Sequence, residues 1–145
     1  MSISKSSSAR VPGWDRALED LATAHVSIAP EWGVSDCLMT AADAIKAVIG
    51  EDPLVKFRGK YKTEAGAARK MRANGCENVK DVFENYLQLE PVNRLVARRG
   101  DVGVMIINDE YVAGFICGTG FAVKQPNGLA FYPVTDIEQA YRVGV

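Results

Sequence analysis

Residues 36–50 read DCLMTAADAIKAVIG, and this stretch decides how the rest of the chain is arranged. Asp36 is a residue type that caps helix N-termini, and Gly50 is the usual residue just past a helix end. A helix is therefore predicted from Cys37 to the residue before Gly50. One of its faces is an apolar stripe, and an adjacent face is small: the stripe is Leu38, Ala42, Ile45 and Ile49, and the small face is Cys37, Ala41 and Ala44. Because small residues let a sheet approach closely, we expect this helix to pack against one.

Three further helices are predicted, one before this helix in the sequence and two after it. The first runs from about residue 13 to residue 25, with Trp14, Leu18 and Leu21 on one face. A third spans residues 63–75, between a Thr-Glu start and an Asn-Gly stop. Asn78 caps a fourth, which ends before Pro91. Between the second and third helices, residues 54–62 are expected to form an extended connector.

After residue 100 the sequence changes to short segments rich in β-branched and aromatic residues. They are separated by the turn signals NDE (108–110), TG (119–120) and PNG (126–128), which is typical of an antiparallel β-meander. The last segment, residues 137–145, fits either a turn of helix or an edge strand. Helices followed by a sheet predict a single α+β domain over residues 11–145. The serine-rich residues 1–10 are expected to form an arm that lies against a partner subunit, or else against its own domain.

Composition excludes several function classes. The net charge is −1 and the isoelectric point is about 5.8, so nothing favours nucleic acid or an anionic membrane as a partner. No apolar run approaches the length of a membrane span, and none follows residues 1–10 as in a signal peptide. We expect the protein to be made in the cytoplasm. Three scattered cysteines and one histidine predict neither a disulfide framework nor a metal site, and no cofactor is expected.

Cys37 is the candidate catalytic residue. A helix N-terminus favours a thiolate, but the adjacent Asp36 carboxylate disfavours it, and a cysteine nucleophile also needs a base. The alternative is that Cys37 is a small residue at the contact between helix and sheet. His25, the single histidine, is a candidate base, although at the end of a predicted helix it is more simply a charge–dipole partner.

These features resemble the NlpC-type papain-fold peptidoglycan endopeptidases. The resemblance rests on Asp36-Cys37 opening a helix, on Gly100-Asp101 before a strand, and on residues 113–120 (AGFICGTG) in the next strand. It implies a papain-like fold in which that next strand begins with a catalytic histidine. Here the corresponding residue is Val112. The third polar residue of the family's triad falls near Lys124 or Gln125, and a lysine has no lone pair with which to orient an imidazole.

The chain as a whole is also similar to a small family of phage and prophage proteins of uncharacterised function. The shared features are an N-terminal tryptophan helix, WG..DC (32–37), the helix end at 50–53, a connector tyrosine at Tyr61, GD (100–101), and a C-terminal P…AYRV pattern. This resemblance implies a tail-tip component of a siphophage virion. Its expected partners are the hub and distal-tail proteins, contacted through the arm and exposed loops.

Two main hypotheses follow for function. The first is a catalytically degenerate structural subunit of the tail tip. The second is an active cysteine peptidase or amidase that cleaves peptidoglycan, with Cys37 as nucleophile and a base from an unexpected place, His25 included. A third, a small binding module unrelated to phage, also fits the composition. The chain has two basic clusters. Residues 56–62 are interpreted as a solvated connector or a subunit contact, and Arg98-Arg99 leads into the strand that Asp101 opens.

Overall fold

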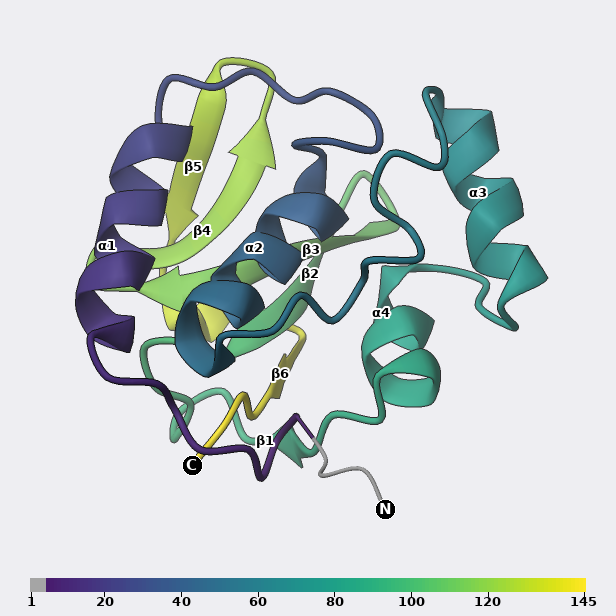
Figure 1. Ribbon diagram of the computed structural model, residues 1–145. Coiled ribbons are helices and arrows are strands. Elements are labelled where there is room, and N and C mark those ends of the chain that lie inside the picture. Colours follow the sequence, from purple (N-terminus) through teal and green to yellow (C-terminus); the bar gives the residue numbers. More distant parts are fainter. Residues whose placement is uncertain (1–4) are drawn as a thin grey trace.

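The computed structural model describes residues 5–145 and has four helices packed on a six-stranded antiparallel sheet (Figure 1). The helices are α1 (Trp14–His25), α2 (Cys37–Ile49), α3 (Glu64–Ala73) and α4 (Val79–Asp81), which continues as a π-helical turn, η1 (Val82–Tyr86). The strands are β1 (Pro91–Val92), β2 (Val102–Ile107), β3 (Glu110–Cys117), β4 (Gly120–Gln125), β5 (Gly128–Tyr132) and β6 (Gln139–Tyr141), with a 3₁₀ turn, η2 (Val134–Asp136), before β6. The predicted α+β class is confirmed.

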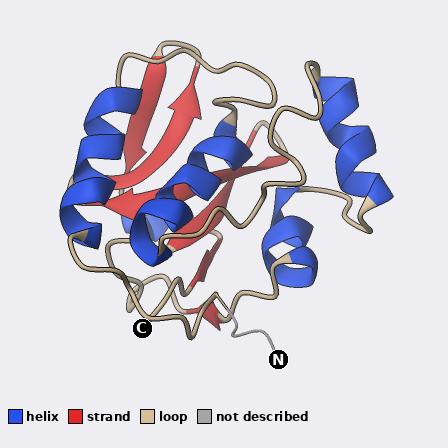
Figure 2. Cartoon of the chain, in the orientation of Figure 1, coloured by secondary structure: helices blue, strands red, loops and turns tan. Residues whose placement is uncertain are grey.

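Helix α2 occupies the centre of the molecule, between α1 and the α3–α4 pair (Figure 2). It begins and ends as predicted. The Asp36 side chain accepts from the Met39 backbone N–H at 2.9 Å, and Gly50 has the left-handed φ of 79° that closes a helix. Ala41 and Ala44 are fully buried. The small face of α2 thus allows the close approach to the sheet that its composition predicts.

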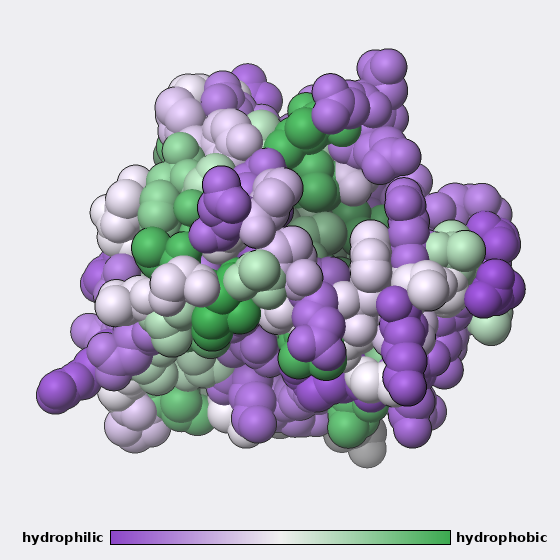
Figure 3. Space-filling model, turned by 90° about the horizontal axis from the view of Figure 1, so that it is seen from above, coloured by the Kyte–Doolittle hydropathy of each residue, from purple (hydrophilic) through white to green (hydrophobic). Residues whose placement is uncertain are grey.

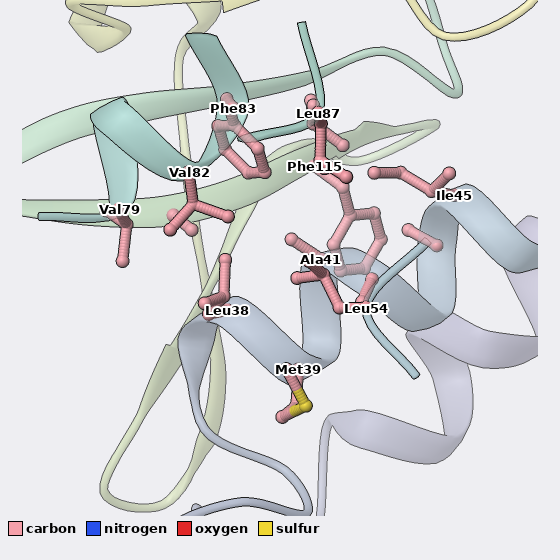
Figure 4. Close-up of a cluster of buried hydrophobic side chains, with 14 of the residues drawn as sticks. Leu38, Met39, Ala41, Ile45, Leu54, Val79, Val82, Phe83, Leu87 and Phe115 are labelled. Carbon is pink, nitrogen blue, oxygen red and sulfur yellow. The ribbon is translucent and has the colours of Figure 1, made fainter. Parts of the chain in front are cut away.

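The main hydrophobic core lies between α2, β3 and the α4–η1 segment. Figure 4 shows Phe115 of β3 reaching toward Ala41 of α2 and Leu54 of the connector, with Val82 and Phe83 beside them. These side chains are fully buried. Burying an aromatic or aliphatic side chain of this size stabilises the fold by roughly 1.5–3 kcal/mol relative to exposing it.

The connector between α2 and α3 is not extended, contrary to the prediction for residues 54–62. It folds into successive turns, in which the Leu54 carbonyl accepts from the backbone N–H groups of Phe57 and Arg58 at 2.9 and 3.1 Å. Leu54 and Phe57 are both fully buried. An extended chain would direct residues three positions apart to opposite sides, whereas a turn directs the side chains of Leu54 and Phe57 into the same core.

The predicted meander is confirmed as strands β2 to β5, joined in order by antiparallel pairing. The first hairpin turns at Asn108 and Asp109, whose φ angles of 52° and 65° are those of a tight hairpin turn. The last segment contains a strand, β6, but not at a sheet edge. It lies between β1 and β2, with Tyr141 opposite both Pro91 and Val102.

The N-terminal segment from Lys5 onward lies against the C-terminal segment of the same chain (Figure 1). The Gly144 backbone N–H donates to the Lys5 carbonyl at 2.8 Å, and that of Val145 donates to the Ser8 carbonyl at 2.9 Å. For residues 5–10 the neighbours are therefore in the same domain. Residues 1–4 of the predicted arm lie outside the described residues.

The Asp101 carboxylate stabilises this contact between the N-terminal and C-terminal segments. Its carboxylate accepts from the Arg10 guanidinium at 3.1 Å, from the Val143 backbone N–H at 3.0 Å and from the Arg98 backbone N–H at 3.0 Å. The side chains of Arg10 and Asp101 are both buried. The aspartate of the GD motif thus joins the start of the domain, the start of β2 and the end of the chain.

Candidate functional site

The segment before Cys37 is held in place by Asp36. One carboxylate oxygen accepts from the Gly33 backbone N–H and from the Tyr61 hydroxyl, each at 2.8 Å, and the other caps α2. Asp36 and Tyr61 are both buried. Burial, followed by the Asp36 carboxylate, raises the pKa of Tyr61, so that the tyrosine stays a neutral donor. Asp36 and Tyr61 therefore have structural roles next to Cys37.

The backbone of Gly33 explains the glycine of the WG motif. Gly33 has a φ of 81°, and a side chain at this position would meet the Tyr61 carbonyl oxygen at 2.3 Å. Its own carbonyl accepts from the Gly59 N–H at 2.8 Å. A residue with a Cβ does not fit here, so the loop before α2 and the connector after it are fixed against each other.

The Cys37 thiol is half-buried at the N-terminus of α2, and its pKa is raised to about 11. Burial is the largest cause, and the Asp36 carboxylate adds to it. The Ala113 backbone N–H acts in the opposite direction, since a hydrogen bond to sulfur favours the thiolate. Because burial outweighs the helix N-terminus, Cys37 is a neutral thiol near pH 7.

Cys37 and Val112 line the same cavity, of about 230 Å³. Val112 lies on β3, at the position where the resemblance implies a catalytic histidine. The other lining residues are Pro30, Trp32, Asp36 and Lys124. The expected histidine position at this cavity is thus a valine. The Val112 side chain packs with the buried cluster that includes Met105, on the face of the sheet away from α2, whereas its neighbours Tyr111 and Ala113 pack on the α2 side.

His25 lies at the C-terminal end of α1 and is paired with Lys124 of β4. The Lys124 ammonium donates to His25 Nδ1 at 2.8 Å and to the Ile28 carbonyl at 2.6 Å, with the His25 carbonyl 3.4 Å away. An ammonium only donates hydrogen bonds, so the imidazole accepts through Nδ1. The other ring nitrogen lies 3.7 Å from the Asp43 carboxylate.

The Lys124 ammonium has three N–H groups and three acceptors around it: His25 Nδ1 and the carbonyls of His25 and Ile28. Burial lowers the pKa of Lys124, and Asp43 partly offsets this. The pairing joins β4 to the end of α1 and directs both ring nitrogens of His25 into structural contacts. The sequence indicated His25 as a candidate base and Lys124 as one of two positions near the family's third polar residue. It contained no signal that the two touch, because the contact joins residues 99 positions apart.

A second cavity of about 460 Å³ adjoins the first, and both are lined by Trp32, Cys37 and Val112. We call the two together the groove. Its remaining walls come from α3, from the segment before α4 and from the β2–β3 hairpin. The added apolar lining residues are Ala67, Ala68, Met71, Val79 and Tyr111, and the added polar ones are Glu64, Glu77, Asn78, Asp109 and Glu110.

The groove lies at the end of the molecule where the α1–α2 connection and α3 project (Figure 1). Figure 3 views the molecule from that end and shows hydrophobic patches surrounded by hydrophilic residues. Trp32 belongs to this surface, with 42% of its area exposed. Sequence reasoning gave Cys37 and Val112 but not the groove, because its walls come from segments far apart in the chain.

Within residues 5–145, no three His, Cys, Asp or Glu side chains gather in a way that could hold a metal ion. In that same part of the chain, no helix is long and apolar enough to cross a membrane.

The sequence profile of a domain of unknown function, DUF6950, matches residues 9–143. The match includes every helix and strand described above. No curated protein matches the chain.

Proposed function

Because this chain belongs to the DUF6950 family, whose function is unknown, we propose its role from the site itself. It is a catalytically inactive papain-like domain of the NlpC type that serves as a structural subunit of a siphophage or prophage tail tip. The observation that carries this proposal is the cavity beside Cys37, where the thiol has a pKa of about 11 and the expected histidine position is Val112. A cysteine nucleophile needs a paired base and a lowered pKa, and this site has neither.

The papain-like part of the proposal is supported by the arrangement of elements. A helix that starts with the cysteine packs on the sheet beside β3, and Asp101 precedes the first strand of the meander. Val112 and Lys124 lie on β3 and β4, the two strands on which the resemblance implies the histidine and the third polar residue. These are the positions expected if the catalytic residues of such a site were replaced while its scaffold was kept.

The tail-tip part rests on the motifs shared with the phage and prophage family. The proposed partners are the hub and distal-tail proteins, and the proposed location is the tail tip of the virion. Residues 5–10 pair with their own C-terminal segment. We therefore assign the contacts with other subunits mainly to exposed loops.

The location is tested on purified particles. Tails from a strain that carries the gene are expected to contain the chain, as identified by mass spectrometry, and antibody labelling is expected at the tip. Tails that lack the chain, while unassembled lysate contains it, would contradict the structural role.

The enzymatic alternative is tested on purified peptidoglycan, with the free protein and with assembled tails. We expect no soluble fragments from wild type beyond those from Cys37→Ala. Fragments that disappear in Cys37→Ala would show that the groove is an active site. In that case His25→Gln would test whether the single histidine acts as the base.

A further inference from the structure

A small loop between β1 and β2 exposes apolar side chains next to positive charge. We call residues 93–98 the basic loop. Leu95 and Val96 are the most exposed large hydrophobic side chains among the described residues, at 68% and 67%. The loop is a defined turn, because the Asn93 carbonyl accepts from the Val96 and Ala97 N–H groups at 3.0 and 3.1 Å. It therefore presents Leu95 and Val96 to solvent in a fixed shape.

The positive charge of the basic loop comes from Arg94 and Arg98. Arg94 donates to the Ile137 carbonyl at 3.1 Å, and Arg98 donates to the Gly144 carbonyl at 3.0 Å. Within residues 5–145, neither guanidinium forms an ion pair with a carboxylate. Both charges are thus available to an acidic surface on another molecule.

The groove has the opposite character. Its apolar lining is bordered by four exposed carboxylates, those of Glu64, Glu77, Asp109 and Glu110. None of the four has an ion-pair partner in the described part of the chain. An apolar recess with unpaired negative charge around it fits an apolar segment that carries positive charge.

We propose that the groove of one copy of this chain binds the basic loop of a second copy. Leu95 and Val96 enter the apolar part of the groove, near Met71 and Tyr111. Arg94 and Arg98 then face the carboxylates of the rim. Burying two apolar side chains supplies the affinity, and the opposite charges orient the contact and speed association.

The two surfaces lie at opposite ends of the molecule. The groove is beside α3 and the α1–α2 connection, whereas the basic loop follows β1, near the end where residues 5–10 pair with the C-terminal segment (Figure 1). A contact between two different surfaces of identical chains is head-to-tail. It continues from copy to copy until the assembly closes as a ring or extends as a filament.

This inference rests on the proposed function, since a groove filled by a neighbouring copy is not open to a substrate. The two proposals nevertheless fail separately. Cleavage of peptidoglycan by the wild-type protein would contradict the proposed function, and it would be seen without any change in the association state of the chain. A chain that never self-associates would remove only the head-to-tail contact and leave the tail-tip assignment to its own test.

The first experiment is sedimentation velocity of the full chain from micromolar to millimolar concentration, at low and high salt. We expect species larger than a dimer at low salt and smaller species at high salt, because salt screens the charges at the interface. The double variant Leu95→Asp/Val96→Asp and the rim variant Glu64→Lys/Glu110→Lys are each expected to sediment as single chains of about 15.7 kDa. Val55→Asp is the matched control, because Val55 is 65% exposed and lies outside the groove and the basic loop, and it is expected to associate like wild type.

The second experiment mixes the two variants that do not associate. One retains an intact groove and the other an intact basic loop, so the mixture is expected to form a one-to-one complex and nothing larger. All substituted positions are exposed, so urea midpoints should match wild type and report that each variant folds. A wild type that is monomeric at millimolar concentration, association that survives Leu95→Asp/Val96→Asp, or a mixture that stays monomeric would each overturn the proposal. The first of these results would assign the groove to a different protein.

Discussion

The Cys37 side chain lies at a helix N-terminus, a place that normally lowers a thiol pKa, yet burial and Asp36 raise it to about 11. The competition is decided by solvation. The partial charge of a helix end is worth at most about 2 kcal/mol, and each pKa unit corresponds to roughly 1.4 kcal/mol. A single cysteine at a helix start is therefore weak evidence for catalysis until its surroundings are known.

We expect iodoacetamide to alkylate Cys37 slowly at pH 7, because on the order of one thiol in ten thousand is ionised when the pKa is about 11. The rate should rise with pH up to that value. Peptide mass spectrometry separates the Cys37 product from those of Cys76 and Cys117. Fast alkylation of the wild-type residue would contradict a raised pKa and favour the enzymatic alternative.

The capping role of Asp36 could be predicted from the residue type and its position before the helix. Its bond to the Tyr61 hydroxyl could not, because the partner lies 25 residues away on a segment whose conformation was predicted wrongly. Local sequence specifies which backbone groups a cap satisfies. It does not specify which distant side chain fills the remaining acceptor.

Asp36→Ala is expected to lower the free energy of unfolding by about 2–4 kcal/mol, measured by urea denaturation. The change removes the cap of α2, worth roughly 1 kcal/mol, and leaves the buried Tyr61 hydroxyl and Gly33 N–H without their acceptor. Tyr61→Phe removes only one of the three hydrogen bonds and should cost about 1 kcal/mol. If Tyr61→Phe were as damaging as Asp36→Ala, the cap would contribute little.

At the scale of elements, the helices and the β2–β5 meander follow from local signals, whereas the place of β6 in the sheet does not. Asp36, Gly50, Thr63 and Asn78 occupy the capping positions that the sequence assigns to them. The place of β6 between β1 and β2 depends on pairing with strands formed far earlier in the chain. Nothing within residues 137–145 specifies that position, so the segment was predicted as an edge strand or a helical turn.

Helix α3 is held less firmly than α2. Of its ten residues only Ala67 is buried, whereas nine of the thirteen residues of α2 are. We expect the amides of α3 to exchange with deuterium at lower protection than those of α2, as measured by mass spectrometry of short peptides. Equal protection of the two helices would show that α3 opens only when the whole domain unfolds.

At the scale of the whole molecule, one carboxylate connects three parts of the chain. Asp101→Ala is expected to lower the free energy of unfolding by about 3–5 kcal/mol in urea denaturation, because it leaves the buried Arg10 guanidinium without its counterion. Exchanging the charges in Arg10→Asp/Asp101→Arg should not restore stability, since the Val143 and Arg98 N–H groups would face a cation. Asp15→Ala is the control: it removes an exposed carboxylate from the first turn of α1 and should change the free energy of unfolding little.

The groove also belongs to this largest scale. Its acidic rim residues come from α3, from the segment before α4 and from the β2–β3 hairpin, and no local pattern connects them. The sequence could identify the cysteine and the missing histidine, because both are positions in a motif. It could not identify the surface around them, because that surface depends on how distant elements pack.

The pairing of residues 5–10 with the last residues of the domain has a consequence for synthesis. A chain leaves the ribosome from its N-terminus, so Lys5, Ser8 and Arg10 emerge well before their partners at residues 143–145. The helices and the β2–β5 meander can begin to form on the growing chain. The hydrogen bonds between residues 5–10 and the C-terminal segment therefore form only after residues 143–145 have been translated, later than the Arg10–Asp101 pair can form.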